Sequence, residues 1–231
     1  MHDTTMDDVT DRVTLVSSDA AIATSGGAGQ VSGASQEGSA KITATWSDAA
    51  AATLGVTVKA AECHPVINEF TTGSGSAPTA AANEFIELYN PCTGPIDVTN
   101  WTLDYRGGNT VGAADSNEMV KLTGEMAAGA LRTYGGTAFP GAVSERWVDA
   151  SGMGQTVGAV GLRSADTSLI DSVAYGTVAN GHPFAENNDP AGSMANGLSA
   201  SRRPFDGKDE DDNNVDFMIL TTPTPGALNT P

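Results

Sequence analysis

The sequence predicts an all-β protein, and three observations support this fold class. The chain of 231 residues contains 27 Gly and 11 Pro, so turns are frequent and long helices are disfavoured. Only 6% of the residues are aromatic and 17% are charged, while Ala, Thr, Gly and Val are abundant, which is typical of β proteins built from small residues. Apolar and polar residues alternate in short runs, as in strands that bury one face. We therefore expect two β-sandwich modules, the N-terminal one incomplete.

Four alternating runs make up the N-terminal part of the chain. Each is bounded by Gly, Ser or Asp, and we expect strands at residues 12–16, 30–33, 41–46 and 54–58. Four strands are about half of a β-sandwich.

A second series of strands begins after residue 62. Residues 65–70 and 83–90 are expected as strands on either side of a polar loop at residues 71–82. The second of these runs alternates, with Ile86 and Leu88 on one face and acids on the other. This pattern predicts that one face is buried and that the other carries the acids.

Further along, the turn at residues 90–95 leads to an expected strand at residues 96–103. Its Trp101 is large enough to fill the space between two sheets, so we expect it to anchor the core. Near the end of the chain, Pro223 and Pro225 cannot donate to a sheet ladder. They should mark the point where the chain leaves the sheet.

The N-terminal runs resemble a known family. The matching runs are Asp8-Val9-Thr10-Asp11-Arg12-Val13-Thr14, Ser17-Ser18-Asp19, Ile22-Ala23-Thr24, Gly29-Gln30-Val31-Ser32-Gly33 and Gly38-Ser39-Ala40-Lys41-Ile42-Thr43-Ala44-Thr45. As an ordered series they resemble the C-terminal part of a bacterial immunoglobulin-like (Big) domain, a module of surface adhesins and of stalks of secreted proteins. The resemblance covers residues 3–60, and we assign residues 1–60 to a partial domain of this kind.

The chain departs from that family in one respect. A full Big domain has two more strands ahead of Asp3, and without them a sheet edge and a core face are uncovered. Two explanations are open. The chain is cut from a longer protein, or a strand of another molecule fills the gap by strand exchange, which is a route to self-association.

The C-terminal part of the chain contains a second ordered series of characteristic runs. They are Val66-Ile67-Asn68-Glu69-Phe70, Glu84-Phe85-Ile86-Glu87-Leu88-Tyr89-Asn90-Pro91, Ile96-Asp97-Val98, Trp101-Thr102-Leu103, Gly158-Ala159-Val160-Gly161-Leu162-Arg163, Leu169-Ile170-Asp171-Ser172-Val173-Ala174-Tyr175-Gly176, Leu198-Ser199-Ala200-Ser201-Arg202, residues 209–217 and Pro223-Thr224-Pro225-Gly226-Ala227-Leu228-Asn229. This series resembles the lamin tail domain, an immunoglobulin-like β-sandwich of nuclear lamins that also occurs in bacterial secreted proteins. The resemblance covers residues 64–229, and we assign residues 61–231 to this domain. It implies a hairpin at residues 158–176 that closes the sandwich.

The charge of the chain limits its partners. It carries 28 acidic and 11 basic residues, a net charge of -17, so a surface that neutralises the phosphates of nucleic acid or of an anionic membrane is disfavoured. The charge has two open interpretations, a solvated acidic surface that keeps a secreted protein soluble and a surface that binds cations.

The densest acidic stretch is residues 206–216, with six acids. Oxygen ligands of a calcium loop alternate along the chain, and the candidate calcium ligands at that spacing are Asp209, Asp211, Asn213 and Asp216. The glycine and the terminal Glu of an EF-hand are missing, so that motif fails. The alternative is a turn whose side chains cap backbone amides. Arg202 and Arg203 are expected to pair with this run.

Cys63 and Cys92 are too few for a structural zinc site. We expect them to form a disulfide, as in an extracellular domain, while two buried thiols are the alternative.

The first residues are acidic and no apolar run approaches 18 residues, so neither a signal peptide nor membrane insertion is predicted within this chain. We expect a bacterial protein that is secreted or displayed at the cell surface.

Candidate catalytic groups are sparse. Glu69, Glu84 and Glu87 offer carboxylates for glycoside chemistry, but the resemblance favours surface or turn-capping positions for them. The three histidines, His2, His64 and His182, lack the sequence context of a nucleophile, and His182 lies in an apparent solvent-facing loop. No catalytic residue and no cofactor other than calcium is predicted.

These observations favour a non-catalytic binding or spacer module whose partner is a surface protein or a glycan. The loops at residues 71–82, 104–117 and 176–197 would supply the contact surface. The alternative is an accessory domain of a secreted hydrolase, of nuclease or phosphatase type, whose catalytic part lies outside this chain. A lamin-like partner of DNA is disfavoured by the charge.

Overall fold

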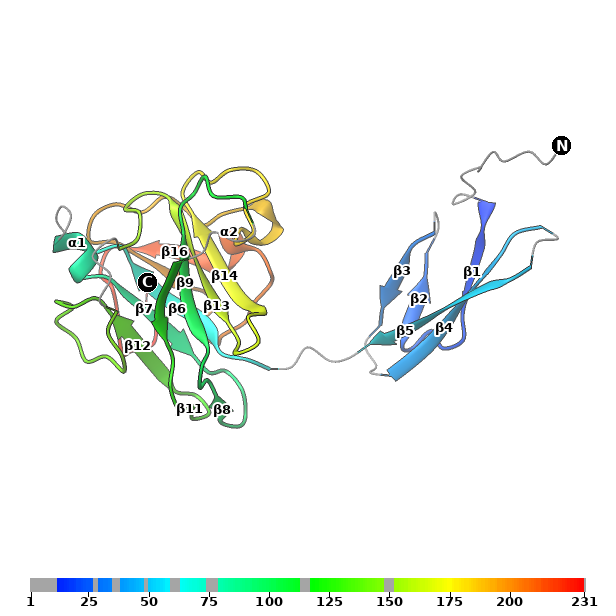
Figure 1. Cartoon of the computed structure of the whole chain (residues 1–231), viewed down its shortest axis with the longest axis horizontal. Coiled ribbons are helices and arrows are strands. Elements are labelled where there is room, and N and C mark those ends of the chain that lie inside the picture. The colour runs from blue at the N-terminus through cyan, green and yellow to red at the C-terminus, as the bar shows by residue number, and fades with distance from the viewer. Residues whose placement is uncertain are drawn as a thin grey trace. The chain divides into compact units, whose positions relative to one another are not determined.

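The computed structural model describes residues 12–26, 29–34, 38–47, 50–58, 63–73, 79–112, 117–147 and 152–230. The chain divides into two compact units, Met1–Glu62 and Cys63–Pro231, here called the N-terminal and the C-terminal unit (Figure 1). Strands dominate both units, so the predicted all-β fold class is confirmed. The division lies two residues beyond the boundary expected at residue 60, while the family of each unit stays a prediction.

The N-terminal unit combines a sheet with a hairpin. Its antiparallel sheet has the order β1-β4-β5, with β1 at Thr14–Ser17, β4 at Gly38–Thr45 and β5 at Ala52–Val58. The hairpin consists of β2 at Ala23–Ser25 and β3 at Val31–Gly33. The core between them is small. Its fully buried members are Ala23, Ala40 and Ile42.

The first sheet of the C-terminal unit is antiparallel and has five strands. Their order is β12-β7-β6-β15-β16 (Figure 1). The bounds are β6 Val66–Thr71, β7 Phe85–Tyr89, β12 Leu131–Gly135, β15 Ser199–Arg202 and β16 Phe217–Leu220. Two short helices flank it, α1 at Thr79–Ala82 and α2 at Asn213–Asp216.

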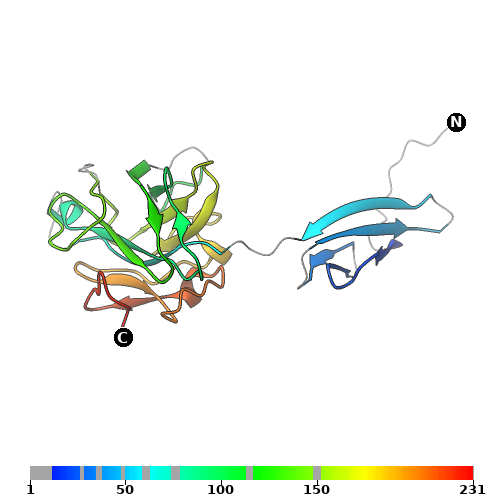
Figure 2. The ribbon, with the colours of Figure 1, turned by 90° about the horizontal axis from the view of Figure 1, so that it is seen from below.

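The second sheet has the order β10-β9-β13-β14 and covers the first, as the two views together show (Figures 1 and 2). Its bounds are β9 Thr102–Arg106, β10 Asn117–Lys121, β13 Gly158–Arg163 and β14 Leu169–Tyr175. A small pair, β8 at Ile96–Asp97 and β11 at Glu125–Met126, and a 3-10 turn, η2 at Glu186–Asn188, complete the unit. The expected hairpin at residues 158–176 is present as β13 and β14.

The core lies between these two sheets. Ile67, Phe70 and Leu88 come from the first sheet, and Leu103 and Val160 come from the second. Trp147 is the largest fully buried side chain, whereas Trp101 is half-buried and packs against the core from its edge. The prediction of a tryptophan anchor between the sheets therefore applies to Trp147 rather than to Trp101.

The strand expected at residues 96–103 is interrupted. Asn100 adopts a left-handed backbone, with φ of 67°, and the Trp101 N–H donates to the carbonyl of Val98. This turn separates β8 from β9 and sends them to different sheets. As expected, the Pro-rich end of the chain follows the last strand, since β16 ends at Leu220.

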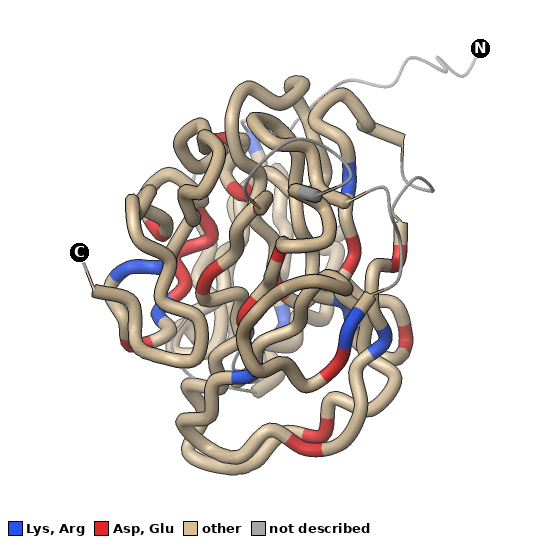
Figure 3. The backbone as a smooth tube through the Cα atoms, turned by 90° about the vertical axis from the view of Figure 1, so that its left-hand side faces the viewer, with Lys and Arg blue, Asp and Glu red and all other residues tan. Residues whose placement is uncertain are grey.

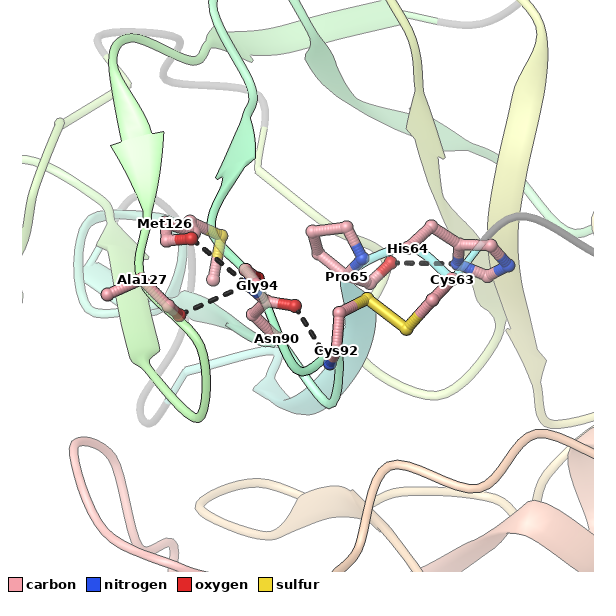
Figure 4. Close-up of a disulfide and its surroundings, with 8 residues drawn as sticks. All are labelled: Cys63, His64, Pro65, Asn90, Cys92, Gly94, Met126 and Ala127. Atoms are coloured by element: carbon pink, nitrogen blue, oxygen red, sulfur yellow. Dashed lines mark hydrogen bonds between the residues drawn. A yellow bond between two sulfur atoms is a disulfide. The ribbon is translucent and has the colours of Figure 1, made fainter.

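The predicted disulfide between Cys63 and Cys92 is confirmed (Figure 4). It joins the start of the C-terminal unit to the turn that follows β7, with Cα atoms 5.6 Å apart. Asn90 shapes that turn, because its side-chain amide donates to the carbonyls of Met126 and Gly94 while its oxygen accepts from the Cys92 N–H. Such a crosslink stabilises by roughly 3 kcal/mol through the unfolded chain.

Among the residues that the structure describes, no helix is long and apolar enough to cross a membrane.

Candidate functional site

The acidic stretch at residues 206–216 is organised around one buried arginine. The Arg202 side chain, at the end of β15, is fully buried. Its Nη2 donates to both carboxylate oxygens of Asp171 at 3.0 Å, and its Nη1 donates to Asp209 at 3.2 Å. Its Nε donates to the carbonyl of Ile67, and the guanidinium lies 4.7 Å from the ring centroid of Phe217. Arg202 therefore fastens the acidic stretch to both sheets.

The electrostatics of this hub favour its charged form. Burial opposes the positive charge, but the surrounding carboxylates outweigh that effect and raise the pKa of Arg202. Asp216 adds a further carboxylate at 3.8 Å. The expected pairing of Arg202 with the acidic run is thus present. Arg203 instead is exposed and donates to the carbonyls of Asn214 and Val215.

Three of the four candidate calcium ligands, Asp209, Asn213 and Asp216, already accept hydrogen bonds in the structure. Asp209 accepts from Arg202 and from the Asp211 N–H, and Asp216 accepts from two other amides of the loop. The Asn213 oxygen accepts from the main-chain N–H groups of Ala174 and Glu186. The Asp211 side chain is exposed. The turn-capping alternative accounts for Asp209 and Asp216, which accept from amides within the loop, and calcium at this loop stays a prediction.

A different group of acids lies close together. Carboxylate oxygens of Asp171, Glu186 and Asp209 are within 4.8 Å of one another, beside a pocket of about 200 Å³. Burial raises the pKa of Glu186 to about 9, and the charges of Asp171 and Asp209 add to this rise. The three come from β14, η2 and the acidic loop, so no local sequence pattern could have revealed the group. Such a group can hold a proton or a cation.

Glu69, Glu84 and Glu87 are buried, which corrects the expectation of surface positions. Both oxygens of Glu69 accept from the Thr224 N–H at 3.0 Å. Glu87 accepts from the Gly226 N–H and from Thr133 Oγ1. Glu84 accepts from the Met153 N–H at 2.8 and 2.9 Å. Their turn-capping role is present, but the capped segments are remote in sequence.

The C-terminal tail explains why the acidic side of β6 and β7 is buried. The Asn229 side-chain amide donates to the carbonyls of Asn68 and Arg202. Asn68 in turn donates to Glu87 and to the Asn229 side chain. Burial raises the pKa of Glu87, while these hydrogen bonds to it oppose the rise. The tail therefore covers carboxylates that the alternation pattern had placed in solvent.

His182 is also buried, so the expectation that it faces solvent is wrong. Its Nε2 lies 3.3 Å from the carbonyl oxygen of Gly107, and its Nδ1 accepts from the Phe184 N–H. Burial lowers its pKa. His182 thus connects the loop after β14 with the loop after β9.

A pocket of about 330 Å³ opens at one end of the C-terminal sandwich. Its lining is uncharged and includes Phe85, Phe139, Pro140, Pro223 and Asn83. Acidic residues are scattered along the described chain rather than gathered in one segment (Figure 3). An uncharged pocket on a strongly acidic chain suits an uncharged ligand group better than a cationic one.

The three predicted contact loops differ in the structure. The segment at residues 71–82 contains the end of β6 and α1, and residues 74–78 lie outside the described part. The segment at residues 104–117 contains the end of β9 and the start of β10, and residues 113–116 are likewise not described. Residues 176–197 form turns and η2, as expected for a loop.

Comparisons with known proteins give little further information. No protein-family model matches the chain, and no curated protein matches it. A solved structure of a DUF4876 family protein from Bacteroides thetaiotaomicron is similar at 11% sequence identity, over 87% of this chain and 86% of that chain, with a TM-score of 0.42. A likeness at this TM-score does not establish a shared fold or function.

Proposed function

We propose that the chain is a non-catalytic binding and spacer module of a bacterial exported protein. The observation that carries this proposal is the use of the buried carboxylates. Glu69, Glu84 and Glu87 each accept hydrogen bonds from main-chain amides of remote segments. A carboxylate that holds a loop in place is a structural group. A catalytic acid or base instead has to reach its substrate.

The uncharged pocket is the proposed contact site. Asn83 and Pro140 lie at its accessible rim, since Asn83 is half-buried and Pro140 is exposed, while Phe139 forms its floor. Aromatic and proline rings offer apolar contacts, and a side-chain amide supplies direction. The proposed ligand is an uncharged part of a glycan or of a surface protein.

The disulfide and the family resemblances support the proposed location. A disulfide between Cys63 and Cys92 is typical of proteins that fold in oxidising compartments. The resemblances to a lamin tail domain and to a Big domain point in the same direction, toward exported bacterial proteins. The runner-up is an accessory domain of a secreted hydrolase.

An array of neutral oligosaccharides and extended peptides, probed with the full chain, tests the pocket. Asn83→Ala and Pro140→Ala are expected to lower the affinity for any ligand found on the array about tenfold, which corresponds to about 1.4 kcal/mol of binding free energy. Val111→Ala is the matched control, because Val111 is exposed and lies outside the pocket lining. If all three variants lose affinity equally, or if none of them loses affinity, this pocket is not the binding site.

The non-catalytic part of the proposal has its own test. The bound oligosaccharide is recovered and its mass is compared before and after incubation, and generic phosphodiester and phosphomonoester substrates are assayed in parallel. Unchanged masses and no turnover are expected. Turnover that disappears in Glu84→Gln or Glu87→Gln would overturn the non-catalytic assignment.

A further inference from the structure

Strand β5 forms an unprotected edge of the N-terminal sheet. It pairs with β4 along its whole length, from Ala52 opposite Ala44 to Val58 opposite Gly38. Within the described residues, no strand pairs with its other side. Toward the rest of the described chain, that side therefore presents N–H and C=O groups without a strand partner, and such an edge is a template for another strand.

The sheet face beside this edge is only partly covered. Residues opposite each other in an antiparallel pair point to the same face, so Leu54, opposite Ile42, points to the core side. Ile42 is 3% exposed, but Leu54 is 62% exposed. Val56 and Val58 pack against the small core, and Leu54 does not belong to it. The apolar face of the sheet therefore extends beyond the residues that pack against the core and includes the exposed Leu54 on β5.

Natural edge strands are usually blocked by charges or by proline. The seven residues of β5, with the sequence ATLGVTV, contain neither. The chain as a whole has a net charge of -17, so most of its surface repels a second copy. A neutral strand is the part of the surface where two copies can approach without that repulsion.

The sequence of β5 is also complementary to itself. In an antiparallel register centred on Gly55, Thr53 lies opposite Thr57 of a second copy, and Leu54 lies opposite Val56. The apolar residues then share one face and the threonines share the other. Lys41, opposite Gly55 in β4, would lie about 14 Å from its counterpart across three strand spacings, where salt screens the repulsion.

We propose that β5 is a self-pairing edge, through which two copies of the chain associate antiparallel with Gly55 opposite Gly55. Each three-stranded sheet becomes half of a six-stranded sheet, and the pairing brings Leu54 of one copy against Val56 of the other. Seven residues per copy form a small interface, so the association is weak, with a dissociation constant roughly in the micromolar range or above. This proposal concerns the N-terminal unit, whereas the ligand pocket lies in the C-terminal unit, so each can be tested without the other.

Analytical ultracentrifugation of the full chain over a wide concentration range measures the association. Thr53→Glu with Thr57→Glu places like charges opposite each other twice and should weaken the dimer roughly tenfold or more. Thr53→Glu with Thr57→Lys places opposite charges there and should restore it. Both threonines are exposed, so the fold tolerates the changes, which circular dichroism verifies. Val16→Glu, on the opposite edge strand β1, is the matched control and should leave the dimer intact.

A crosslink tests the register directly. A Cβ atom at Gly55 would meet no other atom within 4 Å, so Gly55→Cys is accommodated. Because residue 55 lies opposite itself in the proposed dimer, mild oxidation should link two copies, whereas Thr53→Cys should link far less efficiently. A chain that is monomeric at every concentration overturns the proposal. So does association that Val16→Glu abolishes, or association that all β5 variants retain, because the interface between the two copies would then lie outside β5.

Discussion

The two units of this chain reach stability in different ways. Among its described residues, the core of the N-terminal unit has only Ala23, Ala40 and Ile42 as fully buried members, and Leu54 and Val16 are exposed. The C-terminal unit buries a large core, and it also buries charged side chains that connect its loops to its sheets. The difference shows that the C-terminal unit uses inward-facing polar contacts in addition to its core, whereas the N-terminal unit leaves an apolar side chain exposed on its edge strand β5.

Replacement of the buried Arg202 should cause the largest loss of stability. Arg202→Met leaves Asp171 buried without its partner, which typically costs about 3–5 kcal/mol. Urea unfolding followed by fluorescence reports the two units separately, in variants that keep either Trp46 or the pair Trp101 and Trp147. Arg203→Met is the control and should cost less than about 1 kcal/mol, since Arg203 is exposed. Equal stability of the two variants would contradict the role of Arg202 as a hub.

The stability of the N-terminal unit should instead be most sensitive to substitutions in its small core. Ile42→Ala removes one of three fully buried side chains, and such changes cost about 2–5 kcal/mol. We expect the transition reported by Trp46 to disappear while the C-terminal unit unfolds as in the unaltered chain. Val16→Ala, at an exposed position, should change little. If both units lose stability together in Ile42→Ala, they do not fold independently.

The disulfide should matter only to the C-terminal unit. Replacement of Cys63 and Cys92 by Ala is expected to lower its free energy of unfolding by roughly 3 kcal/mol. The melting temperature of this double variant, compared with that of the unaltered chain with and without reductant, measures the effect. A variant that melts at the same temperature as the oxidised chain would show that the crosslink adds nothing.

The pH dependence should distinguish the units further. Burial raises the pKa of Glu84 from 4.5 to about 8 in the folded state. The folded state then binds more protons than the unfolded state between pH 4.5 and 8, so stability falls as pH rises through that window. The slope is at most about 1.4 kcal/mol per pH unit for one group. Glu84→Gln keeps an acceptor for the Met153 N–H and should flatten this slope, whereas a slope unchanged by the substitution would show that Glu84 is not its source.

The addition of calcium should have the smallest effect on the stability of the protein. Because Asn213 and Asp216 already accept main-chain hydrogen bonds, any calcium binding to the metal-free protein is expected to be weak, with little heat in calorimetry and a small rise in melting temperature. Binding that Asp209→Asn or Asp211→Asn abolishes would support the calcium prediction for this loop, whereas no heat at all would contradict it.

The strands and the disulfide could be predicted because their signals are local. Alternation placed β6 and β7 within one or two residues, and the resemblance to the lamin tail domain placed β13 and β14 within one residue. The burial of Glu69 could not be predicted, because its capping partner, Thr224, is 155 residues away. The acids Asp171, Glu186 and Asp209 likewise come from three elements that only the tertiary structure brings together. Long-range polar contacts leave no periodic trace in a sequence.

The bonds from Asn229 to Asn68 and Arg202 have a consequence for biosynthesis. Strands β6 and β7 emerge from the ribosome first, but the hydrogen bonds that Glu69 and Glu87 accept from Thr224 and Gly226 form only after these residues have been made. We therefore expect nascent chains that stop at residue 220 to be more protease-sensitive in the C-terminal unit than chains that include residues 221–230. Closure of this unit late in synthesis would be compatible with the proposed export of the protein.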